Sequence, residues 1–280
     1  QTVQWSVRVL MPASWSIADQ DLVVCQLRAR LAEVVEQAQA AGLAAPQWQV
    51  IPPETPEAWW GEFDLQLKRW TREARAEAML ILAVDSALDD ESVERWQAIG
   101  ELFTAQNQTG RVPGEAAAGL LVVSKALHAR LADAKLPQMP VRLSRPVHLQ
   151  RDKSADSAGR IGAAALTDAM TQALSVAGMA PSPSLMVVAD ADHRASRTTE
   201  LFEALQAVVP GLDPMQNVAR AGEALGDVGV ARSLLSVALG CAAVWASDGE
   251  QVALATHVQS THDRVVLALS AGGAAGAVPV

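Results

Sequence analysis

Two short, uninterrupted apolar segments constrain the fold of this chain more than any other feature. Residues Met79–Val84 and Leu185–Ala189 carry only apolar side chains, and each lies between segments whose apolar residues recur at helical spacing. Strands of this kind are typical of sheets that are covered by helices on both faces. The sequence therefore predicts a layered α/β architecture with helices between or outside the sheets.

The predicted elements follow a similar order in the two halves of the chain. In the first half we expect helices at Asp21–Ala41, Glu57–Ala76 and Glu91–Ile99, and strands at Gln4–Leu10, Gln47–Ile51, Met79–Val84 and Ala116–Ser124. In the second half we expect helices at Gly159–Ala177, Arg197–Val208 and Asp227–Ala246, and strands at Val141–Leu149, Leu185–Ala189, Val252–Gln259 and Arg264–Ser270. This order predicts one compact unit made of two similar halves, residues 1–140 and 141–280, with a Gly-rich end at Ala271–Val280 that frays.

The composition excludes several classes of function. The net charge is −9 and no run of Lys and Arg interrupts it, so the chain lacks the basic surface of a nucleic-acid binder. Cys25 and Cys241 stand far apart without CxxC or metal-ligand spacing, which argues against a disulfide framework. We expect both thiols to be buried structural residues.

Membrane insertion is not expected within this chain. Apolar stretches such as Leu234–Ala246 are shorter than the roughly 20 residues that cross a bilayer. The first residue is Gln1 rather than Met, which leaves open a removed signal or an upstream anchor. The expected location is the cytoplasm.

Three motifs in a fixed order carry a resemblance to a known family. The first is Ala83-Val84-Asp85-Ser86, and the second runs from FTAQN at Phe103–Asn107 to GRVPGEAAA at Gly110–Ala118. The third, ALGDVGVA at Ala224–Ala231, precedes a long apolar segment and two closing strands. These motifs resemble those of the β-ketoacyl synthases, whose strings read approximately GVDS, FTAENxxGxxPGEGAA and GHTxGAAG. The resemblance is close from the Met79–Val84 strand onward and poor before it.

This resemblance implies a thiolase-like fold, layered α/β/α/β/α with two pseudo-duplicated halves. It assigns structural roles to the motif residues Asp85, Pro113, Gly114, Glu115, Gly226 and Gly229. From the residues alone, Gly110 and Gly114 suit tight turns with positive φ, and the alanines after them allow close approach of strands. Glu115 is interpreted as a structural polar contact, with a buried carboxylate paired to Arg111 as the alternative.

The resemblance also implies where a ketosynthase would hold its Cys–His–His triad. The nucleophile would lie near Trp59–Phe63, where no Cys or Ser stands. The first histidine would lie at Ala189 or Asp190, and His193 comes a few residues later. The second would lie at Asp227, where a carboxylate that only accepts hydrogen bonds replaces a histidine. We therefore expect no catalytic residue, cofactor or metal site, and no ketosynthase activity.

A protein-binding role is the leading hypothesis for a chain with the fold motifs of an enzyme and without its triad. The candidate interaction residues are Trp59, Trp60 and Phe63. Trp59 and Phe63 share helical spacing and could be core residues, whereas the adjacent Trp60 faces elsewhere and would be a binding hot spot if exposed. Degenerate ketosynthase-like proteins include adaptors that load lipase effectors onto type VI secretion machines, and this chain resembles them.

Two other hypotheses stay open. A chain-length-factor-like subunit would pair with an active ketosynthase in fatty acid or polyketide synthesis, and a homodimer could form through the strand near the nucleophile position. Residual decarboxylase or thioesterase activity would need a hidden active site, such as a pair of Cys25 and His193 brought together by folding.

Overall fold

The first half of the chain forms a four-stranded sheet in the computed structural model, which describes residues 2–131, 138–159 and 162–272. Its strands are β1 (Gln4–Leu10), β2 (Gln47–Ile51), β3 (Glu77–Ser86) and β4 (Glu115–Val123), in the spatial order β2-β1-β3-β4. β1 is parallel to β2 and β3, and β4 is antiparallel to β3. The helices of this half are α1 (Ile17–Ala40), α2 (Trp59–Glu73), α3 (Asp90–Ala98) and α4 (Lys125–Arg130).

The second half forms a six-stranded sheet. Its strands are β5 (Val141–Leu143), β6 (Val147–Gln150), β7 (Met186–Ala189), β8 (Val218–Arg220), β9 (Ala253–His257) and β10 (Asp263–Ala271). Their order is β5-β10-β9-β7-β8, and β6 pairs with β10 beside β5. The helices of this half are α5 (Ala164–Ala177), α6 (Ala195–Val208), α7 (Pro214–Asn217), α8 (Ala221–Leu225), the 3₁₀ turn η1 (Gly229–Ala231) and α9 (Arg232–Ala246).

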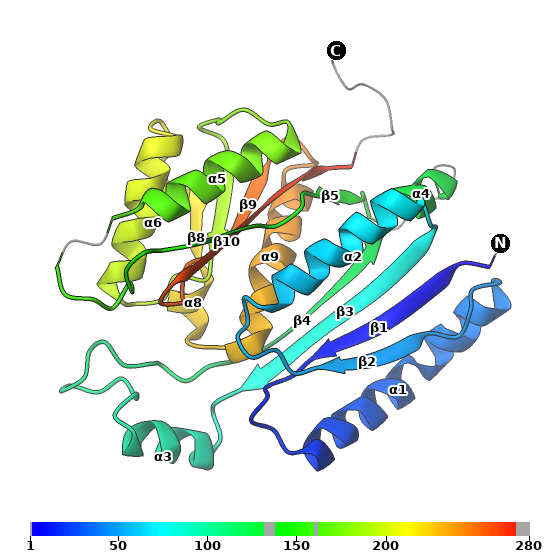
Figure 1. Cartoon of the computed structure of the whole chain (residues 1–280), viewed down its shortest axis with the longest axis horizontal. Helices are drawn as coiled ribbons and strands as arrows, with labels where there is room; N and C mark the ends of the chain where they lie inside the picture. The colour runs from blue at the N-terminus through cyan, green and yellow to red at the C-terminus, as the bar shows by residue number, and fades with distance from the viewer. Residues whose placement is uncertain (1, 132–137, 160–161, 273–280) are drawn as a thin grey trace.

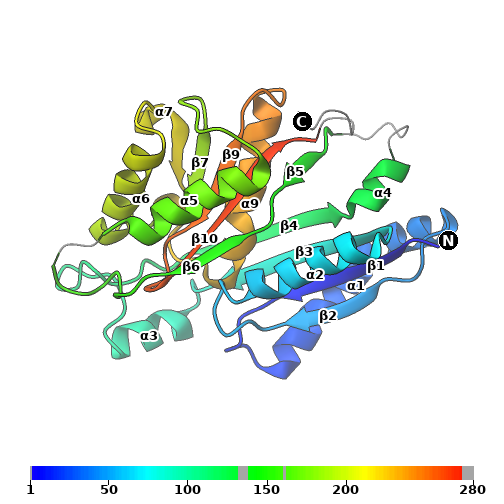
Figure 2. The same ribbon diagram turned by 45° about the horizontal axis from the view of Figure 1, so that its top comes forward.

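Helices and sheets alternate in five layers, as Figures 1 and 2 show. α1 packs on the outer face of the first sheet, and α5 and α6 pack on the outer face of the second. α2 and α9 lie between the sheets, where Trp59 and Phe63 of α2 share a buried core with Leu234 and Val237 of α9. The expected α/β/α/β/α layering is therefore present.

The two sheets repeat one topology. The order β2-β1-β3-β4 in the first sheet matches β8-β7-β9-β10 in the second, with the same parallel and antiparallel pairings. In both halves a helix joins the first two strands of this repeat, and a central helix precedes the last two. The second half contains an addition to this repeat, made of β5, β6 and α5, which come before β7. A division of the chain at residue 140 stays a prediction.

The central helix of the second half is apolar enough to be mistaken for a membrane span. The stretch Gly229–Ala246 could cross a bilayer by length and composition, and 44% of it is buried inside the protein. It packs against β4 of the first sheet and against β9 and β10 of the second. Such burial between two sheets is typical of a core helix.

Several predicted elements differ from the structure. The strand predicted at Val141–Leu149 divides into β5 and β6 around Pro146, which has no backbone N–H to donate to a ladder. The helix predicted at Asp227–Ala246 begins at Arg232, because Gly229 adopts a positive φ of 50°. β8, α7 and α8 were not predicted. Most of the Ala271–Val280 end lies outside the described residues.

The glycines of the family motifs let the two halves touch. A side chain on Gly114 would place its Cβ 2.1 Å from the carbonyl oxygen of Leu225, so only glycine fits there. Gly226 faces the Val112–Pro113 backbone with a φ of +77°. Neither Gly110 nor Gly114 has a positive φ, so the predicted reason for these two glycines was wrong. Close backbone approach, rather than a left-handed turn, requires glycine at Gly114.

Candidate functional site

Three buried carboxylates surround one arginine at the centre of the molecule. The Nη2 atom of Arg232 donates to Glu57 Oε1 over 2.8 Å. Its Nε lies 3.6 Å from Asp190 Oδ2, and its Nη1 lies 3.8 Å from Asp227 Oδ1. The first contact is a hydrogen bond, and the other two are ion pairs without one. We call Glu57, Asp190, Asp227 and Arg232 the Arg232 cluster.

Local structure brings these four side chains together from distant parts of the sequence. Glu57 lies just before α2, Asp190 directly follows β7, and Asp227 lies in the turn between α8 and η1. Arg232 is the first residue of α9, and the hydroxyl of the next residue, Ser233, donates to the carbonyl of Pro56 over 2.8 Å. The starts of the two central helices therefore meet at the end of β7. Carboxylates are favoured there, because helix N-termini carry partial positive charge.

The Arg232 cluster is nearly shielded from solvent. The side chains of Glu57, Asp190 and Asp227 are 2%, 3% and 7% exposed, and that of Arg232 is 12% exposed. Burial lowers the pKa of a guanidinium, yet the carboxylates of Glu57, Asp227 and Asp190 more than offset this and raise the pKa of Arg232. Three carboxylates share this one buried cation, so further hydrogen-bond donors are needed to stabilise them.

Backbone and side-chain donors supply the rest of the stabilisation. Burial alone would raise the pKa of Asp190, but His257, Arg232 and the backbone N–H of Val258 hold it below its usual value. Asp190 Oδ1 accepts from the amides of Val258 and Gln259 over 2.6 and 3.1 Å. The buried ring of His257 places Nδ1 3.6 Å from Asp190 Oδ2.

Asp227 is held by a second arginine. Arg111 Nε donates to Asp227 Oδ2 over 2.7 Å, and the N–H of Gly229 donates to Oδ1 over 3.0 Å. Burial opposes ionisation of Asp227, but Arg232, Arg111 and Gly229 together lower its pKa. Arg111 therefore links the motif of the first half to the Asp227 turn of the second.

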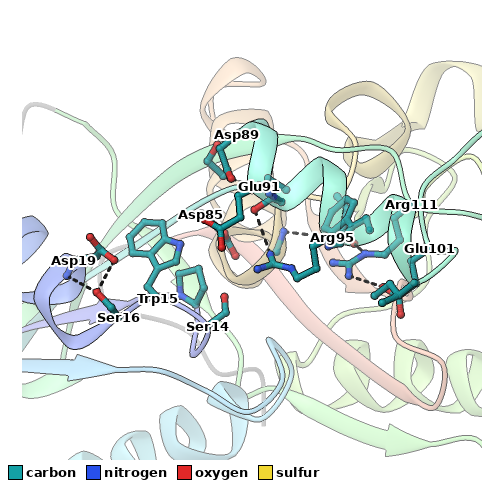
Figure 3. Close-up of a pocket in the computed structure, with 18 of the residues that line it drawn as sticks. Ser14, Trp15, Ser16, Asp19, Asp85, Asp89, Glu91, Arg95, Glu101 and Arg111 are labelled. Atoms are coloured by element: carbon teal, nitrogen blue, oxygen red, sulfur yellow. Dashed lines mark hydrogen bonds and ion pairs between the residues drawn. The ribbon is translucent and has the colours of Figure 1, made fainter.

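A polar groove opens beside the cluster, between the start of α1, the end of β3 and α3. It has a volume of about 870 Å³, and Asp227 and Gly229 form part of its wall. Figure 3 shows acidic and basic side chains around it, with Asp85 near the middle and Arg95 and Arg111 on one side. The guanidinium of Arg111 lies 3.9 Å from the centre of the Trp96 ring, in a cation–π contact.

Asp85 is the unusual carboxylate of this groove. Its Oδ2 accepts from the backbone N–H of Val230 over 2.8 Å. Burial raises its pKa to about 6, and the negative charge of Asp227 adds to the rise. A Cβ on Gly229 would lie 1.8 Å from Asp85 Oδ2, so glycine at Gly229 makes room for this carboxylate.

The structure corrects the predicted interaction surface. Trp59 and Phe63 are fully buried, and Trp60 is 1% exposed. The ring of Trp60 lies edge-on to Phe63 at 5.5 Å and 5.4 Å from the ring of His257. Trp60 is therefore not an exposed hot spot, because α2 lies between two sheets and is covered on several sides.

The prediction that both cysteine thiols are buried was wrong. Cys25 is exposed on α1 rather than buried, and Cys241 is half-buried, with a pKa raised to about 11 by burial. Glu115 makes a polar contact, because it is exposed and accepts from Ser86 Oγ over 3.3 Å, and the alternative of a buried pair with Arg111 does not hold. Its place on β4 turns its side chain away from the core.

Of the four degenerate motif positions, Ala189, Asp190 and Asp227 are buried and His193 is half-buried. Ala189 ends β7 and is fully buried, so Asp190 is the residue that projects into the centre. His193 packs edge-on against Phe103 at 4.9 Å, with its Nε2 buried and unpaired. Asp190 and Asp227 come together at Arg232, whereas His193 packs against Phe103 instead.

Sequence reasoning missed Glu57, Arg232 and His257. The expected nucleophile is a Cys or Ser, so a glutamate just before Trp59 gives no signal of a functional site. Glu57 follows a Pro-rich loop and Arg232 begins a helix. Nothing in the sequence around either residue indicates that the two form a pair. Only the fold shows that they meet.

Known proteins bear out the resemblance. Residues 141–269 match the family model described as Type VI lipase adapter protein Tla3, C-terminal. No curated protein sequence matches the chain. The solved ishigamide ketosynthase/chain length factor is similar to this chain with 20% identity and a TM-score of 0.58, over 98% of this chain and 75% of that one.

Two further solved structures show the same fold. The PfaC keto synthase–chain length factor has 13% identity and a TM-score of 0.58, over 99% of this chain and 33% of that one. A variant of OleA from Xanthomonas campestris with cerulenin has 12% identity and a TM-score of 0.54, over 96% and 73% of the two chains. The fold is therefore thiolase-like, as the motifs implied.

Removal of Arg232 should leave three buried carboxylates without the cation that they share. We expect Arg232→Met to lower the free energy of unfolding by about 3–5 kcal/mol at pH 7. In the native chain, Asp190 and Asp227 have lowered pKa values, so their contribution is present above pH 4 and is lost as the pH falls. In the variant burial raises these pKa values, so its deficit should shrink toward pH 5.

Urea denaturation at pH 7 and pH 5 measures this difference. The matched control is Arg145→Met, because Arg145 makes a two-bond pair with Asp64 but is 51% exposed. The control should cost less than about 1 kcal/mol. A similar small, pH-independent cost for Arg232→Met would contradict the central role of the cluster.

Neutralising Asp85 should stabilise the protein at neutral pH. Because its folded pKa is raised from 3.8 to about 6, its contribution is fully present below pH 4 and is lost as the pH rises through 6. Asp85→Asn keeps an oxygen for the Val230 amide, and we expect a gain of roughly 1–2 kcal/mol at pH 7, after a discount for solvent screening. The gain should vanish near pH 4.

Asp89→Asn is the control on the same groove. Its carboxylate is exposed, and hydrogen bonds from Ser92 lower its pKa, so this change should not stabilise the protein at pH 7. Thermal unfolding of both variants across pH 4–7.5 tests the account. Destabilisation by Asp85→Asn at pH 7 would show that the charged form is the favoured one.

Proposed function

We propose that this chain is a catalytically inactive ketosynthase-like protein that acts as a binding adaptor for a lipase of type VI secretion. The match of residues 141–269 to a type VI lipase adapter family carries this proposal. It supports a protein as the partner. The role would be exercised in the cytoplasm, where such a lipase would be met before export.

The chemistry at the former catalytic positions supports inactivity. A ketosynthase needs a thiolate to hold the acyl chain and histidines to act on the malonyl unit. In this chain Glu57 lies just before α2, and the resemblance implies that Ala189 or Asp190 and Asp227 stand at the two histidine positions. All three carboxylates are engaged by Arg232, so none is a free nucleophile.

A chain-length-factor-like subunit is the second candidate. The ishigamide ketosynthase/chain length factor and the PfaC protein favour it, since both share the fold over nearly the whole of this chain. The partner would then be an active ketosynthase. A homodimer is a further proposal.

Capture of the tagged chain from its native cell, followed by mass spectrometry, separates the two candidates. The adaptor proposal predicts recovery of a lipase, which should bind again when both proteins are purified. Cells that express the tag alone are the control. Recovery of an active ketosynthase or an acyl carrier protein, without a lipase, would contradict the adaptor proposal and favour the subunit.

A further inference from the structure

The repeated topology shows a strand position that is filled in one half and open in the other. β4 occupies in the first sheet the place that β10 occupies in the second. β10 pairs with β9 on one side and with β5 and β6 on the other, both antiparallel. β4 pairs with β3, and no other strand of the described residues pairs with it. Figure 2 shows β4 along the margin of its sheet.

Burial differs accordingly between these two equivalent strands. Arg264–Leu269 of β10 are all buried, whereas every residue of β4 is exposed or half-buried. Leu121 of β4 is 68% exposed. The inward side chains of Ala118 and Leu120 pack on the central core without being fully covered by it. The addition that covers β10, made of β5, β6 and α5, has no counterpart on β4 among the described residues.

The hydrogen-bond register identifies which backbone groups of β4 are free. Ser124 N–H donates to Glu77 and Ala87 N–H donates to the carbonyl of Gly114, at the two ends of the ladder. Even-numbered residues of β4 therefore bond to β3, and the alternate ones direct their N–H and C=O groups away from it. The residues with outward backbone groups are Glu115, Ala117, Gly119, Leu121 and Val123.

The β4 edge also lacks the features that protect the other sheet edges from pairing with further strands. Edge strands are usually short, charged or interrupted by proline, because free edges recruit other strands. β2, the opposite edge of the first sheet, has five residues between Pro46 and Pro52. β8 has three residues, and Pro146 separates β5 from β6. β4 has nine residues without Lys, Arg or Pro.

We propose that an extended segment of a partner protein adds to β4 as an antiparallel strand, with apolar side chains at alternate positions. The antiparallel direction follows from β5 and β6 on β10, where Val141, Leu143, Val147 and Leu149 alternate with polar residues. Strand addition gives affinity through backbone bonds and specificity through alternate side chains. This inference rests on the proposed adaptor function and names its binding edge.

A second copy of the chain fits the open position less well. The β4 edges of two copies could pair. The outer face of both β4 strands would then stay uncovered, and Leu121 would remain exposed. In the second half, α5 packs on both β10 and β6 and so covers this face. A partner segment that continues beyond its strand can cover both the edge and the face.

The test compares two variants in which strand addition to β4 is hindered with a matched control. Ala117→Lys/Leu121→Lys places charge on the open edge, and Ala117→Pro removes an outward N–H without breaking a bond to β3. Leu65→Lys is the control, because Leu65 is 66% exposed, much like Leu121, but belongs to α2. The probe is the lipase recovered with the native chain, and thermal unfolding checks that each variant is folded.

We expect both β4 variants to bind this lipase about tenfold or more weakly, and Leu65→Lys to bind like the native chain. Hydrogen exchange should show the Ala117, Gly119 and Leu121 amides fast in the free chain and protected in the complex.

Several results would overturn the inference in distinguishable ways. Unchanged lipase binding by the β4 variants would leave the adaptor function standing and reject β4 as its surface. Slow exchange of these amides in the free monomer would show that the edge is already covered. A native dimer that the β4 variants convert to a monomer would make a second copy the occupant. Recovery of no partner would reject both proposals together.

Discussion

The fold depends on the compensation of three buried carboxylates by the guanidinium of Arg232. This one side chain ties the start of α2, the end of β7 and the Asp227 turn to the start of α9. A buried ion pair adds little net stability by itself, yet the loss of one partner is costly. The cluster therefore fixes how the central helices meet the sheets. The Arg111 bond to Asp227 extends this control to the Gly110–Ala118 motif.

The same compensation supports the proposal that this enzyme-like centre is inactive. Glu57, Asp190 and Asp227 are acceptors of hydrogen bonds when ionised, whereas the ketosynthase reaction needs a thiolate and imidazoles. The pKa values of Asp190 and Asp227 are lowered, so both carry charge at neutral pH. Stability and protein binding are compatible with such a centre, and the type VI lipase adapter match of the second half agrees with that use.

Local patterns predicted the layered fold because they report burial directly. The apolar segments that became β3 and β7 are strands with both faces covered, and helical spacing located α2, α6 and α9. The surroundings of single residues were harder to predict. A helical pattern cannot show that α2 lies between two sheets, so it left open an exposed Trp60, which is only 1% exposed in the structure. The Glu57–Arg232 contact spans 175 positions, and no local pattern reports such a pair.

The most direct test of the central claim is whether any acyl group attaches to the chain. The purified protein is incubated with malonyl- and long-chain acyl-coenzyme A and with acylated carrier protein, and its intact mass is measured, with a ketosynthase of known activity as the positive control. The account predicts an unchanged mass, because the proposed inactive centre holds carboxylates paired with Arg232 and no thiolate. An acyl adduct that survives denaturation, and that is lost in Cys25→Ser or Glu57→Gln, would contradict it.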